Sequence, residues 1–356
     1  MNPTIVYCEG AFNTTNGKTA HGLVRFTERF DVVTVIDSRY AGQDAGAVLD
    51  GRPNGILLTA NLHDALALCQ KKDRPAHDFV IGLAPDGGRL PAEARKVILD
   101  ALEARLDVYS GLHDYLSKDE VIRTKAEKVS RKLTDIRKPP PINSLHFFSG
   151  KIDEVKSLRI AVLGTDSAIG KRTTAWKLVH GFREAGHTAE LVGTGQTAWL
   201  QGAKHGIVMD SLVNDFVSGE IEHAVHETWL DTHPEVIVLE GQGSLLNPAY
   251  PGGFELLAAG RPHIVILQHA PRRLEYDGFP GFPLHPLSHQ IMAIEVISGK
   301  KVSAITLNHE GMKPTEIVGE CRKIKEQIGI PAYDVLEHGP QALVNLLKPN
   351  LKKRHG

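Results

Sequence analysis

Short apolar runs of strand length alternate with amphipathic segments along most of the chain. In the first part, four runs that end in turn residues predict β-strands: Thr4–Cys8, Val32–Asp37, Gly55–Thr59 and Phe79–Ala84. Between them, Leu62–Cys69 and Ala92–Leu106 have apolar residues three and four positions apart, which predicts helices. This alternation is typical of β–α–β units, so we expect a parallel sheet covered by helices.

A second alternation of the same kind follows a proline-rich boundary. Pro139, Pro140 and Pro141 stop any helix and favour an extended connector, so we place the boundary within residues 139–157. Downstream, five runs rich in Val, Ile and Leu predict strands that are buried on both faces: Arg159–Leu163, Glu190–Val192, Val236–Leu239, His263–Gln268 and Val302–Leu307. The prediction is an α/β protein with two domains, residues 1–145 and 146–356.

The segment before the boundary, residues 109–138, has a helical pattern and then becomes strongly basic. Between Arg123 and Lys138 there are seven Lys or Arg residues and only two acids, Glu127 and Asp135. This basic stretch is interpreted as a solvated helix face or, alternatively, as a phosphate-binding patch.

The most informative motif is a phosphate-binding loop at Gly164–Thr174. The apolar strand at Leu158–Leu163 leads into it, and a helix with a stripe of apolar residues follows. Backbone N–H groups of such a loop and of the helix N-terminus form a cradle for phosphate oxygens, and a lysine adds a positive charge. The candidate cofactor-binding residues are Gly164, Thr165, Asp166, Ser167, Gly170, Lys171, Arg172, Thr173 and Thr174.

This loop departs from the standard P-loop at two points. Five residues separate its glycines instead of four, and Arg172 stands where a Ser or Thr would bind Mg²⁺ in a nucleotide hydrolase. Thr173 follows one position later, on a different side of the helix. The phosphate cradle is therefore predicted, whereas the position of a magnesium ligand is in doubt.

Polar residues follow two further strands at the edge of the sheet where ligands bind in open α/β proteins. Glu240 ends a buried strand and is the candidate general base, or the residue that orders a metal ion or water. Gln242 and Ser244 are candidate hydrogen-bond donors to a carbonyl oxygen, and Gly193–Thr197 forms a second glycine-rich turn. Alternatively, Glu240 is only a capping acid in a tight turn.

Composition excludes several classes of protein. The 41 basic and 42 acidic residues give a net charge of −1, which argues against a nucleic-acid-binding protein. No apolar run approaches the ~20 residues that span a bilayer, and the first residues have no signal-peptide pattern, so a cytoplasmic protein without a membrane partner is expected. Neither the three cysteines nor the 18 histidines show a metal-ligand spacing, and no metal site is predicted.

These motifs together resemble a bacterial family of two-domain P-loop proteins, formerly catalogued as a domain of unknown function and typified by D-glutamate N-acetyltransferase. The resemblance rests on Gly164–Thr174, Gly193–Thr197, the acidic segment from Asp210 to Glu222, Glu240–Ser244 and Leu267–His269, with weaker matches at Gly111–Asp114 and Asp135–Pro139. It implies a Rossmann-like N-terminal domain, a P-loop C-terminal domain and acetyl transfer from acetyl-CoA to the amine of D-glutamate or a similar acidic amino acid.

For such a transfer we expect Glu240 to act as base, and Gln242 with backbone N–H groups to bind the oxyanion. The candidate residues for the amino-acid substrate are Gln196 and Thr197, in the second glycine-rich turn, and Arg137 and Arg39. The arginines are chosen because a guanidinium group binds a carboxylate with two hydrogen bonds. Coenzyme A carries a pyrophosphate and a 3′-phosphate, which the loop and Arg172 can hold without a metal ion. A homo-oligomer is also expected.

Two other functions stay open. The start of the loop and its spacing also resemble dethiobiotin synthetase, so an ATP-dependent ligase or kinase is the alternative, with ATP and Mg²⁺ as cofactors and Thr173 or Asp166 at the metal. A nucleotide- or CoA-sensing protein without catalytic activity is the third.

Overall fold

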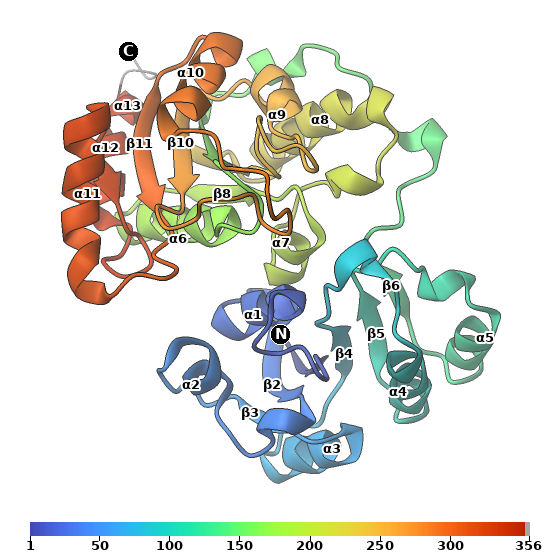
Figure 1. The fold of residues 1–356 in the computed structure, drawn as a ribbon. Coiled ribbons are helices and arrows are strands. Elements are labelled where there is room, and N and C mark those ends of the chain that lie inside the picture. Colours follow the sequence, from blue (N-terminus) through green and yellow to red (C-terminus); the bar gives the residue numbers. More distant parts are fainter. Residues whose placement is uncertain (353–356) are drawn as a thin grey trace. The chain divides into compact units, whose positions relative to one another are not determined.

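The strands form two separate six-stranded sheets in which every strand runs parallel to its neighbours (Figure 1). The structure is a computed structural model, and it describes residues 1–352. The last four residues, which belong to the predicted second domain, lie outside the described part. The predicted α/β class is confirmed. In the described part of the chain, no helix is both long and apolar enough to cross a membrane.

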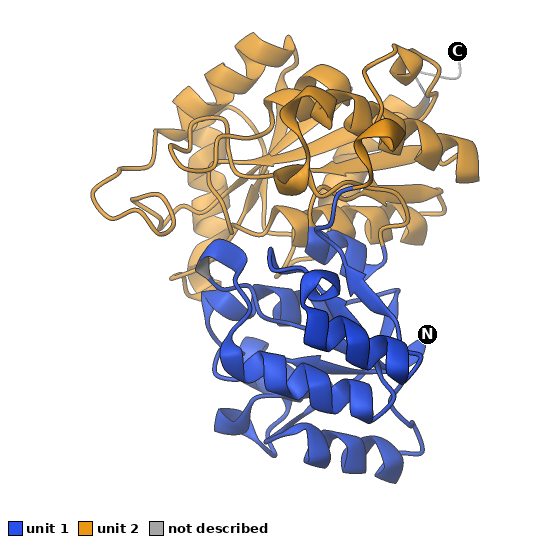
Figure 2. Ribbon diagram, turned by 90° about the vertical axis from the view of Figure 1, so that its right-hand side faces the viewer, with its two compact units in different colours: residues 1–139, 196–202 blue, residues 140–195, 203–356 orange. Residues whose placement is uncertain are grey.

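The chain divides into two units, which Figure 2 shows in different colours. Unit 1 comprises residues 1–139 and 196–202, and unit 2 comprises residues 140–195 and 203–356. The sheet order in unit 1, β3-β2-β1-β4-β5-β6, is that of a Rossmann fold. Its elements are β1 (Asn2–Tyr7), α1 (Lys18–Arg25), β2 (Phe30–Ile36), α2 (Ala45–Asp50), β3 (Leu57–Thr59), α3 (Leu62–Lys71), β4 (Asp78–Ile81), α4 (Ala92–Glu103), β5 (Asp107–Ser110), α5 (Glu120–Lys128), β6 (Leu133–Asp135) and α7 (Gln196–Gln201).

In unit 2 the sheet order is β12-β11-β10-β7-β9-β8, so the strand that leads into the phosphate loop lies in the middle. Every residue of β7 and β9 is buried, as expected for strands covered on both faces. The elements are β7 (Leu158–Gly164), α6 (Lys171–Glu184), β8 (Ala189–Val192), α8 (Asn214–Thr232), β9 (Val236–Glu240), α9 (Phe254–Ala259), β10 (Ile264–His269), α10 (Leu287–Ser298), β11 (Val302–Leu307), α11 (Pro314–Ile328), β12 (Ala332–Tyr333), α12 (Gln341–Leu347) and α13 (Pro349–Lys352).

Helix α7 belongs to unit 1, although it directly follows a strand of unit 2. The Gln201 side-chain amide donates to the carbonyl oxygens of Gly22 and Phe26, at 2.9 and 3.1 Å. Leu200 is fully buried in the core of unit 1, and the guanidinium of Arg29 lies 3.9 Å above the Trp199 ring. The prediction of a glycine-rich turn at Gly193–Thr197 missed this helix, which begins at Gln196. A helix of six residues does not reveal from its sequence which sheet it covers.

All nine predicted strands are present, and residues 1–352 contain three further short strands that were not predicted. The prediction of a helical pattern from residue 109 was wrong in part, because Tyr109 lies in β5 and residues 133–135 form β6. In the basic segment, Arg123 and Lys125 of α5 form ion pairs with Glu127 and Glu103, as expected for a solvated helix face.

Candidate functional site

The phosphate loop connects the carboxyl end of β7 to the first residue of α6. Gly170 directly precedes the helix with a φ of +93°, a conformation that glycine adopts without strain. A Cβ atom at residue 164 would lie 2.8 Å from Cδ of Lys171, so the loop packs closely around the lysine side chain only because residue 164 is glycine. The N-terminus of a 14-residue helix therefore points into the loop, as a phosphate site requires.

The ammonium group of Lys171 is buried between two turns of the chain. Its Nζ donates to the carbonyl oxygens of Asp166, at 2.6 Å, and Gly243, at 2.7 Å. Burial lowers the pKa of this group from 10.5 to about 8, against the opposing effect of Asp166 and Glu240. Lys171 thus joins the phosphate loop to the turn after β9 and supplies a positive charge that titrates within an accessible pH range.

The Asp166 carboxylate is fully occupied by protein donors. Its Oδ1 accepts from Ser167 N and Asn247 Nδ2, at 2.7 and 2.8 Å, and its Oδ2 accepts from Arg273 Nη1 and Asp277 N, at 2.8 and 2.9 Å. Four bonds use the lone pairs of both oxygens, so this carboxylate holds the loop in place and offers no free oxygen to a metal ion.

Side chains at the end of β10 support the loop from the neighbouring strand. Gln268 Oε1 accepts from the hydroxyls of Thr174, at 2.6 Å, and Thr306, at 2.5 Å. His269 Nδ1 lies 3.1 Å from Thr165 Oγ1, and burial lowers the pKa of His269 to about 4. The hydroxyl of Thr174 is therefore committed to the protein interior, and His269 is a neutral imidazole at physiological pH.

Glu240 ends β9 and binds the glycine-rich turn after β8. Its Oε2 accepts from Thr194 N, at 3.1 Å, and its carbonyl oxygen accepts from Thr194 Oγ1, at 2.8 Å. Only 4% of the residue is exposed, and this burial raises the pKa of the carboxyl group, although Arg172, Thr194 and Lys171 act in the opposite direction. The two strand ends are thereby fixed to each other next to the phosphate loop.

Two hydrogen-bonding side chains lie in the turn that follows Glu240. Gln242 Nε2 would lie 2.7 Å from a Cβ atom at residue 195, so the glycine there makes room for the amide. Among the described residues, Ser244 Oγ has no hydrogen-bond partner although it is buried. The same turn accepts a hydrogen bond from Lys171 through the Gly243 carbonyl oxygen. A buried hydroxyl without a hydrogen bond is costly, so Ser244 Oγ fits a site in which a polar ligand supplies the missing hydrogen bond.

The structure places the predicted substrate residues in unit 1. Arg137 Nε donates to the carbonyl oxygen of Gly111, at 2.6 Å, and a Cβ atom at residue 111 would lie 2.7 Å from Cγ of Gln196. Arg137, Gly111 and Gln196 therefore lie together. Thr197 is buried, with its hydroxyl 3.3 Å from Thr19 Oγ1.

Arg39, the other arginine predicted to bind substrate, is paired with an acid of its own unit. Its Nε and Nη2 donate to the two carboxylate oxygens of Asp37, at 3.0 and 2.7 Å. Phe12 N donates to the same carboxylate at 2.9 Å. This ion pair uses the two-bond geometry that the sequence analysis expected for a substrate carboxylate.

The residues of the site that were not predicted from the sequence include Arg273, Asn247 and Asn308. Arg273 binds Asp166 and the Ser167 carbonyl oxygen and also pairs with Glu310. Asn308 Nδ2 donates to the carbonyl oxygen of Ile169, at 3.2 Å. All three follow the carboxyl ends of β9, β10 or β11, so a search of the residues after every predicted parallel strand would have found them.

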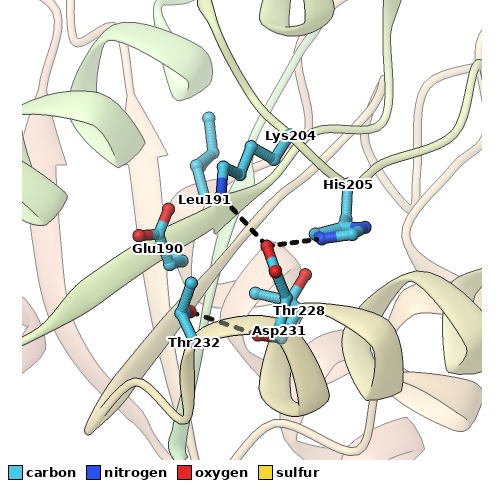
Figure 3. Close-up of a pocket in the computed structure, with 7 residues that line it drawn as sticks. All are labelled: Glu190, Leu191, Lys204, His205, Thr228, Asp231 and Thr232. Carbon is cyan, nitrogen blue, oxygen red and sulfur yellow. Dashed lines mark hydrogen bonds and ion pairs between the residues drawn. The ribbon is translucent and has the colours of Figure 1, made fainter.

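Figure 3 shows the residues that line a small pocket of unit 2, which is separate from this site. Lys204 Nζ and His205 Nε2 both lie near Asp231 Oδ2, at 3.0 and 3.3 Å, beside Glu190 near the start of β8. Because ligands of parallel sheets bind at the carboxyl ends of the strands, we do not assign this pocket to the functional site.

Comparison with known proteins agrees with this architecture. Residues 146–344 match a family described as domain of unknown function DUF1611, P-loop domain, and residues 38–139 match its N-terminal Rossmann-like domain. The chain belongs to the DUF1611 family. The predicted resemblance is thereby confirmed, together with the Rossmann-like and P-loop character of the two domains.

Relatives of this DUF1611 protein include two that are named D-glutamate N-acetyltransferase. The protein from Tritonibacter scottomollicae is 31% identical over 79% of this chain and 84% of its own length. The protein from Pseudoalteromonas sp. is 28% identical over 82% of this chain and 87% of its own length. A crystal structure of a DUF1611 family protein from Anabaena variabilis has a TM-score of 0.89 at 26% identity and covers 98% of this chain and 100% of its own.

Proposed function

We propose that this protein is an N-acetyltransferase that moves the acetyl group of acetyl-CoA to the amine of D-glutamate or a similar acidic amino acid. Two relatives with this activity in their names support the proposal, since they match about four fifths of the chain. The phosphate loop supports it because coenzyme A offers several phosphate groups to a cradle of N–H donors and a lysine.

The donor set around Lys171 is the observation that favours coenzyme A over Mg-ATP. Arg172 occupies the usual magnesium-ligand position, and the carboxylate of Asp166, one of the two alternative metal ligands, is bound within the protein. Thr173 is the alternative ligand that remains for Mg²⁺. A pyrophosphate or 3′-phosphate needs cations and N–H groups, which Lys171, Arg172 and the start of α6 provide.

The roles assigned from the sequence stay predictions. Acetyl transfer requires a base for the ammonium proton, donors for the oxyanion and a group that holds the substrate carboxylates. Glu240, Gln242 with backbone N–H groups, and Arg137 or Arg39 are the respective candidates, with Gln196 and Thr197 near the amino acid.

Release of free thiol from acetyl-CoA tests the proposal directly. The purified protein should release coenzyme A when D-glutamate is added, and the rate should depend on the concentration of the amino acid. Background release with every acidic amino acid, in either stereochemical form, would refute acetyl transfer.

Calorimetry separates this proposal from the alternative, an ATP-dependent ligase or kinase. We expect heat of binding with coenzyme A in the absence of Mg²⁺ and none with Mg-ATP. Saturable binding of Mg-ATP, together with no binding of coenzyme A, would favour the ligase or kinase.

A further inference from the structure

A histidine–aspartate pair lies at the carboxyl edge of the unit 2 sheet and has no role in the site described above. His309 Nδ1 lies 2.5 Å from Asp334 Oδ2. His309 comes two residues after the end of β11, and Asp334 comes directly after β12. Since these strands pair in parallel, with Thr306 opposite Tyr333, both residues leave the sheet at the same edge.

The aspartate of this pair is held rigidly. Its side chain is fully buried, and its Oδ1 accepts from the backbone N–H groups of Leu336 and Glu337, both at 3.0 Å. These bonds leave Oδ2 facing the imidazole. A buried carboxylate on Nδ1 fixes the ring orientation and places the Nε2 lone pair on the opposite side of the ring, the arrangement that makes histidine an effective general base.

The residues on both sides of His309 contact the phosphate loop or its support. Asn308 Nδ2 donates to the carbonyl oxygen of Ile169, and Glu310 pairs with Arg273, which in turn binds Asp166 and the Ser167 carbonyl oxygen. His309 is therefore held between two residues that are connected to the loop, and 28% of its side chain is exposed. The other base candidate, Glu240, is almost completely buried and bound to Thr194.

We propose that His309, oriented by Asp334, is the general base that accepts the ammonium proton of the amino acid, in place of Glu240. This inference rests on the proposed acetyl transfer. His309 Nε2 first takes one proton from the ammonium group and passes it to solvent. The neutral amine attacks the thioester carbonyl, forming the C–N bond. His309 then takes the second amine proton and gives it to the sulfur as the C–S bond breaks. The ammonium group and the thioester are thereby converted into an amide, a thiol and one proton released to solvent.

Charged and titratable groups from neighbouring segments lie around the pair. Asp334 faces the ring from the end of β12, and Glu310 pairs at 2.8 Å with Arg273, which also pairs with Asp166. Cys321 of α11 lies near Asp334, and burial raises the pKa of this thiol to about 11, so it stays protonated near neutral pH. His309 is thus the base that this cluster offers to the amino acid.

The test compares H309Q, E240Q and, as a matched control, H63Q, whose histidine side chain is 92% exposed and lies in unit 1. We expect H309Q to lower kcat by about 10²–10⁴-fold, to remove the acid limb of the pH–rate profile and to leave coenzyme A affinity unchanged. H63Q should behave like wild type, E240Q should keep the acid limb, and added imidazole should restore part of the activity of H309A.

The proposal is overturned if H309Q keeps the wild-type kcat and acid limb, or if E240Q alone removes that limb. It is also overturned if H309Q loses activity only in proportion to its affinity for coenzyme A, since His309 would then be a ligand-binding residue. A wild-type protein that releases no thiol refutes acetyl transfer itself, so that failure is distinguished from a wrong assignment of the base.

Discussion

Burial of Lys171 makes the charge of the phosphate loop sensitive to pH. Its two acceptors are backbone carbonyl oxygens, which do not change charge, so the lysine itself titrates with a pKa of about 8. A phosphate ligand binds the ammonium form. Affinity for coenzyme A should therefore vary little between about pH 6, where the 3′-phosphate is ionised, and pH 8, and fall by about tenfold per pH unit above pH 8, until the higher pKa of the complex is reached.

Replacement of Lys171 by methionine keeps most of the side-chain volume and removes the charge. We expect K171M to weaken coenzyme A binding by about 1.5–3 kcal/mol and to abolish the pH dependence above pH 8. K177M, on the same helix, is the control and should retain both. Calorimetry at several pH values measures these effects, and equal affinity of K171M and wild type would show that the loop does not bind the phosphates.

Gly170 and Gly186 flank the same helix, and both have a positive φ, of +93° and +84°. An alanine at either position should lower stability by about 1–2 kcal/mol, because the left-handed backbone is strained for residues with a Cβ. Only G170A is expected to lose coenzyme A affinity, since its methyl group would enter the cradle. If G170A and G186A bind equally well, the ligand does not approach this turn.

At the scale of elements, continuous apolar runs predicted the strands well because both faces of a parallel strand are buried. β5 and β6 were missed because charged and polar residues interrupt their apolar runs, and β12 was missed because it contains only two residues. The loop around Lys171 was predicted as a motif. Its supporting contacts were not, because Arg273 and Asp166 are 107 positions apart and only the fold brings them together.

Helix α7 is the element whose position differs most from what its neighbours in the sequence indicate. Q201A removes the donor to the carbonyl oxygens of Gly22 and Phe26, and we expect unit 1 to lose about 1–3 kcal/mol of stability. Hydrogen exchange of the amides in α1 should increase, whereas Q70A on the exposed face of α3 should change nothing. Unchanged exchange in Q201A would show that α7 does not stabilise this helix.

At the scale of the whole chain, residues 1–139 form an incomplete domain. Leu200 alone contributes about 1.5–3 kcal/mol by its complete burial in the unit 1 core. A fragment of residues 1–139 should therefore have a lower Tm than the same fragment joined through a flexible linker to residues 196–202. Equal Tm values would show that α7 is dispensable. The homo-oligomer stays a prediction, which light scattering of the full chain can test.

Acetyl transfer to an amine is the central claim, and isotope-labelled acetyl-CoA tests it most directly. The protein is incubated with D-glutamate and acetyl-CoA that carries ¹³C in the acetyl group, and the product is followed by NMR and mass spectrometry. We predict that the label appears in an N-acetyl amide with wild type and at a strongly reduced rate with K171M. Label that stays in the thioester or appears only as free acetate, with every acidic amino acid supplied, would contradict the account.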